Sequence, residues 1–213
     1  MSHSDDSDYQ ALASAESKED AFADAFERFR DRLERAVDLR MDRRVRARVD
    51  PSDVVQESYF ECARRIGEFL ENRPAPLFLW VRYLVLQRLL QLHRMHLGRA
   101  VRDAGREVPI ERLAYPGASS RVLAAHLIAS QTSPSGAAVR EEVRASVEAA
   151  LEDMGDMDRE ILVLRHFEQM SSAEAGQVLG IEHSAARKRY FRALKRLRSV
   201  LEPPPGETEG AGD

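Results

Sequence analysis

Apolar residues recur at intervals of three and four along much of this chain, which is the period of one face of an α-helix. The pattern is clearest from residue 20 to 49, where it predicts one long amphipathic helix. Its apolar positions are Phe22, Phe26, Phe29, Leu33, Val37, Met41 and Val45. Strand-like alternation of apolar and polar residues is almost absent, so the sequence predicts an all-α fold.

Two more helices are expected directly after this one. In DPSDVVQESYFECARRIGEFL, Asp50 is placed as N-cap and Pro51 as the first helical residue, and Asp53 falls in the first turn, where the helix dipole favours an anion. The prolines of ENRPAP then force a break. The following LFLWVRYLVLQRLLQLHRMHLG is apolar on several sides, as expected for the central helix of a bundle.

The chain is expected to form two small helical domains joined by a flexible linker. The domains span residues 19–108 and 135–202, and the linker, 109–134, contains three prolines and one short helical stretch at 122–128. A flexible coil of this kind reaches roughly 30 Å, so the two domains could engage separate surfaces at the same time. Composition predicts disordered tails at residues 1–18 and 203–213.

Composition excludes several classes of protein. The 213 residues carry a formal charge of −4, with no run of eighteen apolar residues and a polar N-terminus unlike a secretory signal. We therefore expect a cytoplasmic protein with no membrane insertion. Cys62 is the single cysteine, expected to be a buried helical thiol. The sequence shows no metal-ligand spacing, glycine-rich phosphate loop or paired catalytic carboxylates, so we expect neither a metal, a cofactor nor enzymatic activity.

The stretch SSAEAGQVLGIEHSAARKRYFRALKRLR, residues 171–198, has the spacing of a helix-turn-helix. Ser171 and Glu174 form a capping box that begins a short helix, and Gly180 turns the chain before a longer one. Gly176 lies inside the first helix, where a glycine normally destabilises, but a position without a side chain lets two helices cross closely.

The second helix of this motif has two different faces. One is apolar and consists of Ala186, Tyr190, Ala193, Leu194, Leu197, Val200 and Leu201. The other concentrates positive charge and predicts DNA binding, with base contacts nearer its beginning and phosphate contacts nearer its end. The alternative is a solvated basic face that complements the helix dipole. Glu182 lies where a serine or threonine cap would be expected, so Ser184 is the alternative cap. The candidate DNA contacts are His183, Ser184, Ala185, Arg187, Lys188, Phe191, Arg192 and Lys195.

Both halves of the chain resemble known segments of one family. Residues 50–69 and 77–98 resemble region 2 of the bacterial sigma-70 family, and residues 151–201 resemble its region 4. The two-domain layout is similar to the extracytoplasmic-function (ECF) subgroup of sigma factors. The phrases SQTSPS and LRHFEQMSSAEAGQVLGI further resemble members of a planctomycete-like type.

This resemblance implies two further sets of site residues in region 2. The family's D-x-V-Q-E segment, which binds core RNA polymerase, corresponds to Asp53, Val54, Val55, Gln56 and Glu57, although the two valines are also candidates for the core. The helix that binds and melts the minus-ten element corresponds to the helix that starts at Leu77, where the family has phenylalanine. Its candidate DNA contacts are Trp80, Arg82, Arg88 and Arg94. Trp80 is either a stacking platform for an unpaired base or a buried core residue.

The resemblance implies a sigma factor. Such a chain binds the β′ clamp helices and the β flap of core RNA polymerase, and it recognises promoter DNA at minus thirty-five with region 4 and at minus ten with region 2. An anti-sigma factor is a further candidate partner. Two alternatives stay open at this point: a helix-turn-helix transcriptional regulator, and a sigma-like adaptor without initiation activity.

Overall fold

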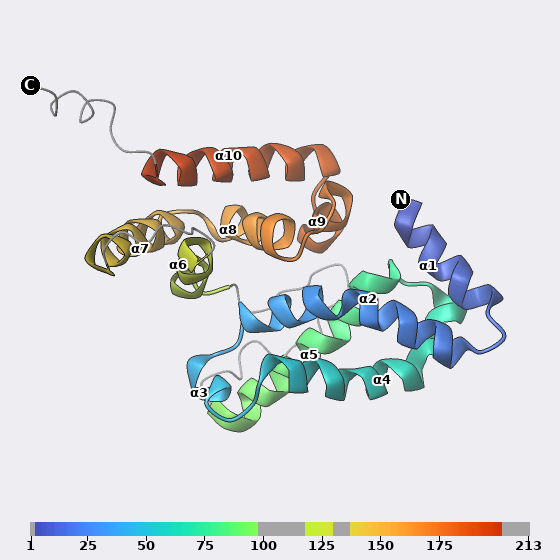
Figure 1. The fold of residues 1–213 in the computed structure, drawn as a ribbon. Coiled ribbons are helices and arrows are strands. Elements are labelled where there is room, and N and C mark those ends of the chain that lie inside the picture. The colour runs from blue at the N-terminus through green and yellow to red at the C-terminus, as the bar shows by residue number, and fades with distance from the viewer. Residues whose placement is uncertain (1–2, 98–117, 130–136, 202–213) are drawn as a thin grey trace, which may run out of the picture.

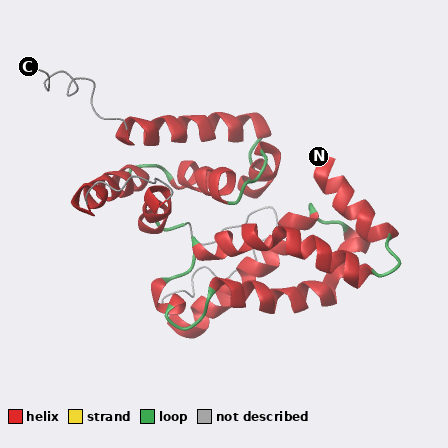
Figure 2. Cartoon of the chain, viewed as in Figure 1, coloured by secondary structure: helices red, strands yellow, loops and turns green. Residues whose placement is uncertain are grey.

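The computed structural model describes residues 3–97, 118–129 and 137–201, and within these ranges the chain is helical with no strand (Figure 2). The all-α fold class is therefore confirmed. The helices form two units (Figure 1). The first unit contains α1 (His3–Ser14), α2 (Lys18–Asp38), α3 (Arg43–Arg46), α4 (Pro51–Asn72) and α5 (Leu77–Leu97). The second contains α6 (Ser120–Ala129), α7 (Ala137–Glu152), α8 (Asp156–Leu162), the π-helical turn η2 (Val163–Phe167), α9 (Ser172–Leu179) and α10 (His183–Leu201).

The first unit is a bundle in which α2 and α4 pack on the apolar α5. The predicted apolar face of α2 is buried, and α4 begins at the expected cap, where the side chains of Asp50 and Asp53 form a capping box. α5 is buried on several sides, including Val81, Val85 and Leu89, because it runs between its neighbours.

The long helix predicted for residues 20–49 is broken in the structure. α2 ends at Asp38, and the short α3 begins after a turn at residues 39–42. The turn lets Leu39 and Met41 both reach the core, and the Arg46 side chain donates to the Asp38 carbonyl at 2.6 Å, which satisfies an orphan acceptor at the end of α2. Periodicity alone could not detect this break, because Met41 and Val45 keep the helical spacing and are both buried.

The N-terminal segment, expected to be disordered, contains the helix α1. Leu12 is buried, and the Tyr9 ring packs edge-on against Phe69 at a centroid distance of 6.5 Å. Ser17 then caps α2 by accepting a hydrogen bond from the Asp20 N–H at 3.2 Å. These anchors explain why the polar segment is helical despite its composition.

The second unit follows the predicted helices closely. α6 extends the short helix expected at residues 122–128 and packs on α7. The rest of the predicted linker, except residues 118–119, lies outside the described residues, as do 98–108 of the first predicted domain and the tail at 203–213. Residues 156–167 form α8 and then η2, after which Gln169 adopts a left-handed φ of 52°.

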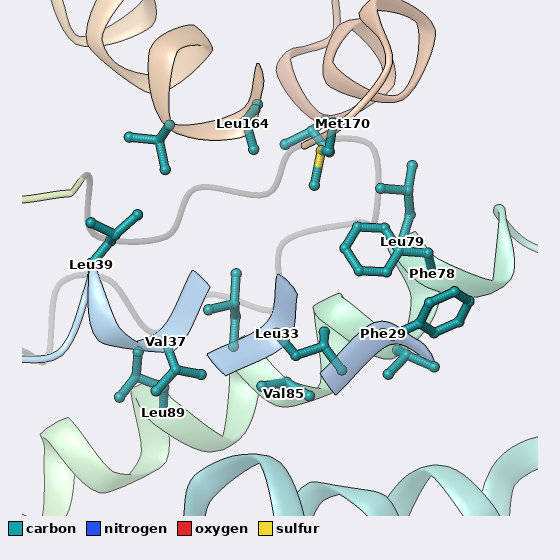
Figure 3. Packing of buried hydrophobic residues seen from close by; sticks show 14 of the residues in the cluster. Phe29, Leu33, Val37, Leu39, Phe78, Leu79, Val85, Leu89, Leu164 and Met170 are labelled. Carbon is teal, nitrogen blue, oxygen red and sulfur yellow. The ribbon is translucent and has the colours of Figure 1, made fainter. Parts of the chain in front are cut away.

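The two units pack against each other through α2, α5 and the segment around η2. Figure 3 shows Leu164 and Met170 of the second unit opposite Leu39, Phe78 and Leu79 of the first. All five are buried, so apolar surface of both units is removed from water at this contact. In Figure 1, α10 lies on the outer side of the second unit, away from this contact.

Candidate nucleic-acid interface

α9, the turn after it and α10 form the predicted helix-turn-helix. The Ser171 N–H donates to Glu174 Oε2 at 2.6 Å, and the Glu174 N–H donates to Ser171 Oγ at 3.1 Å, which completes the capping box. Gly180 ends α9 in the left-handed conformation, with φ 64° and ψ 35°. The Ile181 N–H then donates to the Gly176 carbonyl at 2.9 Å and fixes the turn.

Gly176 is required by the close crossing of the two helices. A Cβ atom at this position would lie 2.7 Å from the carbonyl oxygen of Ile181 and 3.5 Å from the Cα of His183. Both atoms are backbone and cannot rotate away. A residue without a side chain therefore allows α9 to approach the start of α10.

The apolar face of α10 holds the helix in the unit as predicted. Ala186, Ala193 and Leu197 are buried, and Tyr190, Leu194, Val200 and Leu201 pack against the same core. The Arg165 guanidinium lies over the Tyr190 ring, 5.2 Å from its centroid. This packing turns the opposite face of α10 outward.

The outward face brings the predicted DNA-binding residues together. Seven of the eight are exposed, namely His183, Ser184, Arg187, Lys188, Phe191, Arg192 and Lys195, and Ala185 is half-buried. An open depression of about 500 Å³ is lined by Ala185, Lys188, Arg189, Phe191 and Arg192. α10 already begins at His183, so Ser184 lies within the first turn and is not the cap. Its hydroxyl is therefore on the exposed surface.

Neighbouring cations on α10 have protein partners instead. Arg189 donates to Asp158 at 2.7 Å, and Arg196 lies 3.8 Å from Asp153. Phe191 is 57 % exposed, with the Arg187 guanidinium 5.8 Å from its ring centroid. An exposed aromatic ring flanked by cations suits contact with DNA bases and phosphates.

The four candidate minus-ten residues are in different environments. Trp80 is buried and packs on Phe69 at a centroid distance of 4.9 Å. Of the two roles considered for Trp80, the structure therefore shows that of a buried core residue. Arg82, expected to face DNA, is also buried, because it pairs with Glu168 of the second unit. Arg88 donates to Glu57 at 2.6 Å, and Arg94 is exposed.

The candidate polymerase-binding segment is divided between surface and core. Val54 and Val55 are fully buried, which agrees with the second role considered for them, that of core residues. Asp53, Gln56 and Glu57 are exposed on α4. Phe60, one turn further, is 64 % exposed, and sequence reasoning missed it although an exposed aromatic is a frequent anchor of protein interfaces.

Sequence reasoning also missed an ionic cluster between the units. Glu168 is fully buried and accepts from Arg82 Nε at 2.5 Å and from Arg82 Nη2 at 3.1 Å, and Arg40 Nη1 lies 2.7 Å from its Oε1. Burial alone would raise the pKa of Glu168, but the charges and hydrogen bonds of Arg40 and Arg82 outweigh it and lower this pKa to about 2. Its three members are 42 and 86 positions apart in sequence, so no local pattern could have indicated them.

Two classes of site are not found in the described residues. They contain no group of three or more histidine, cysteine, aspartate or glutamate side chains that could hold a metal ion. None of the described helices combines the length and apolar character that a membrane span requires.

Comparison with known proteins matches residues 144–197 to the family described as Sigma-70, region 4. The chain is 25% identical over 154 residues to the RNA polymerase sigma-H factor of Pseudomonas aeruginosa, with 72% of this chain and 74% of that protein covered. It is 39% identical over 59 residues to the RNA polymerase sigma-E factor of Streptomyces antibioticus, which covers 28% of this chain and 33% of that one.

A solved structure, that of CnrH in complex with the cytosolic domain of CnrY, is 22% identical with a TM-score of 0.48 and covers 91% of this chain and 94% of CnrH. The family match lies on the helices that carry the helix-turn-helix and its exposed cationic face. Sequence similarity to a sigma factor extends beyond it to most of the chain. The segment that carries the helix-turn-helix therefore belongs to the family Sigma-70, region 4, and the chain as a whole is similar to RNA polymerase sigma factors.

Proposed function

We propose that this protein directs core RNA polymerase to promoters. Region 4, the second unit, binds the major groove at the minus-thirty-five element through α10, and region 2, the first unit, recognises and opens DNA at minus ten. The exposed cationic face of α10, presented by a helix-turn-helix within the matched family segment, is the observation that carries this proposal. The polymerase performs the chemistry, so the chain itself is not an enzyme and acts in the cytoplasm.

The beginning of α10 suits base reading. His183, Ser184, Arg187 and Lys188 project from its first two turns, the part of a recognition helix that reaches base edges. Lys195, two turns beyond Lys188, is a phosphate contact. Phosphate contacts position the helix, and base-edge contacts specify the sequence.

The exposed side chains at the start of α4 suit a protein partner. Asp53, Gln56 and Glu57 form an acidic and amide surface, and we assign this surface to the β′ clamp helices of polymerase. Phe60 adds an apolar anchor beside it. The β flap is the proposed second contact on polymerase, and an anti-sigma factor is a further candidate partner.

Reconstituted transcription tests the proposal. Purified chain with core polymerase is expected to give promoter-specific initiation on genomic templates, mapped by transcript 5′ ends. Failure to bind core polymerase in a pull-down would refute the proposal. Binding without initiation on any template would indicate a sigma-like adaptor, and DNA binding without polymerase binding would indicate a helix-turn-helix regulator.

A charge-matched pair of variants separates DNA binding from polymerase binding. Lys188→Ala with Arg192→Ala is expected to weaken promoter binding and reduce its salt slope by about 2, because each phosphate contact contributes about 0.9. Binding to core RNA polymerase is expected to stay unchanged. Lys18→Ala with Arg28→Ala removes the same charge from the exposed surface of α2 and is expected to leave both unchanged.

A further inference from the structure

Lysine is rare in this chain, and its placement is uneven. Of the 32 Lys and Arg residues, only Lys18, Lys188 and Lys195 are lysines. Two of these three lie on α10, where both are exposed. Arginine supplies nearly every other cation and contacts phosphate in a bidentate geometry, so positive charge alone does not explain a lysine at these two positions. What distinguishes lysine is its primary amine, a nucleophile that acylation modifies.

Lys188, Arg192 and Lys195 form one exposed row along α10. Their spacing of four and then three residues places them on the same side of the helix. The helix contains no aspartate or glutamate between His183 and Leu201, and none of the three pairs with a carboxylate in the part of the chain that the structure describes. The row is therefore uncompensated positive charge, with an amine on each side of a guanidinium.

An open depression adjoins the first of the two amines. Its volume is about 500 Å³, and it is lined by Ala185, Lys188, Arg189, Phe191 and Arg192. A guanidinium binds phosphate oxygens through parallel hydrogen bonds. The depression therefore suits a small molecule whose phosphate contacts Arg192 while another of its groups reaches the amine of Lys188.

We propose that Lys188 and Lys195 are acylation sites, that their acyl donors carry phosphate, and that acylation weakens promoter binding by α10. The effect on DNA rests on the proposed function, whereas the reaction itself does not. The product is an amide, which removes the positive charge of each lysine.

The reaction is an acyl transfer that needs no oxidant or reductant. With an acyl phosphate, the unprotonated Nζ attacks the carbonyl carbon and a C–N bond forms. The bond from that carbon to the phosphate oxygen breaks, and inorganic phosphate leaves with the proton that the nitrogen loses. A coenzyme A thioester, which also carries phosphate, reacts in the same way with a thiol as the leaving group.

Lys18 supplies a comparison within the same chain. It is exposed at the start of α2, but Glu16, Glu19 and Asp20 lie next to it in sequence and are exposed as well. These carboxylates repel an anionic donor, whereas the cations of α10 attract one. Focusing by a field of one sign raises local concentrations by about tenfold or more, so we expect an anionic donor to react at least about tenfold faster at Lys188 than at Lys18.

Labelling of the full-length chain with acetyl phosphate at pH 8 tests the site. Digestion and mass spectrometry measure the acetylated fraction of each lysine over time. We expect Lys188 to react first, Lys195, which does not line the depression, to react next, and Lys18 to react last. Arg192→Ala removes the phosphate ligand but neither amine, so it should slow Lys188 and Lys195 toward the rate of Lys18.

Two parallel reactions identify the donor and control for access. Acetyl coenzyme A replaces acetyl phosphate in one, and preferential labelling of Lys188 by only one of the two donors supports the site and identifies its donor. The other uses N-acetoxysuccinimide, which is uncharged. Because all three lysines are exposed, this reagent should label them at similar rates.

Acetylation should change promoter binding through charge. Neutralising two cations that contact phosphate should weaken binding and lower its salt slope by about 2, since each contributes about 0.9. In the variant with Lys188→Arg and Lys195→Arg, the affinity should be the same before and after treatment, because arginine keeps its charge and is not acetylated. The matched control, Lys18→Arg, should lose affinity on treatment as wild type does.

Several results would overturn the inference. Equal rates at the three lysines with both phosphate-bearing donors would remove the site. The same preference with the uncharged reagent, or rates that Arg192→Ala leaves unchanged, would show that phosphate recognition plays no part. Acetylation of Lys188 and Lys195 that leaves promoter affinity unchanged would refute the effect on DNA.

The inference and the proposed function fail separately. An untreated chain that binds neither core polymerase nor promoter DNA would refute the function, and preferential acetylation of Lys188 would still stand. A chain that initiates transcription while its three lysines react alike would keep the function and lose the modification site.

Discussion

Replacing Gly176 by alanine should destabilise the protein, although the same change in most helices stabilises. Alanine gains about 1 kcal/mol over glycine inside a helix. At Gly176, however, the new Cβ would lie 2.7 Å from the Ile181 carbonyl oxygen, well inside the 3.3–3.6 Å of even a favourable carbon–oxygen contact. Overpacking of this kind costs about 1–3 kcal/mol, and relieving it moves the turn that positions α10. Subtracting the gain in helix propensity leaves a net loss of up to about 2 kcal/mol.

The assay compares two alanine variants. At about 2–4 °C per kcal/mol for a chain of this size, thermal melting followed by circular dichroism should show Gly176→Ala melting up to about 8 °C below wild type. Gly67 lies inside α4, and a Cβ there would meet nothing within 4 Å, so Gly67→Ala should melt about 2–4 °C above wild type. Promoter binding should weaken only in Gly176→Ala, because only that change displaces α10.

The essential result is that the melting temperature changes in opposite directions, falling in Gly176→Ala and rising in Gly67→Ala. If Gly176→Ala melts at or above the wild-type temperature, α9 and α10 do not cross as closely as the structure shows. If both variants lose stability equally, the contact of the new Cβ with the Ile181 carbonyl is not the cause of the loss at Gly176.

Three further predictions concern a helix cap, a carboxylate and a thiol. Ser171→Ala removes the acceptor for the Glu174 N–H and should lower the free energy of unfolding by about 1 kcal/mol, measured by urea denaturation. The pKa of Glu168 is lowered to about 2 by Arg40 and Arg82 against the effect of burial, so its ion pairs stabilise fully above pH 4.5 and are lost as the pH falls toward 2. Urea unfolding at pH 7, 5 and 3 should show a loss of about 2 kcal/mol at pH 3 that Glu168→Gln lacks; an equal loss in both would contradict this. Burial raises the pKa of the Cys62 thiol to about 12, so a thiol reagent at pH 8 should label it only in denaturant, and rapid labelling of native protein would refute its burial.

Local signals predicted most elements and the face of α10 that carries the cations. The capping box at Ser171, the glycine at 180 and the apolar stripe through Leu197 each act within a few residues, so the sequence shows them directly. Prediction failed where a distant contact decided the outcome. The break after Asp38 depends on the burial of Leu39 and Met41, and the order of α1 depends on Phe69.

The candidate sites divide in the same way. The residues of α10 could be assigned from sequence because one amphipathic helix fixes which side chains face outward. The environments of Trp80 and Arg82 could not be assigned from sequence, because their exposure depends on what packs against α5. Trp80 lies against Phe69, and Arg82 pairs with a carboxylate 86 positions away in the chain.

The sequence by itself determined an all-α chain in two units, a helix-turn-helix near its C-terminus and a concentration of positive charge on one face of α10. These features follow from spacings of three to four residues, which the geometry of a single helix converts into faces and caps. Only the tertiary structure decided that Glu168 is enclosed by Arg40 and Arg82, and that these two arginines of the first unit are covered by the second. Pairing between distant residues depends on how helices pack, and no local pattern in the sequence records it.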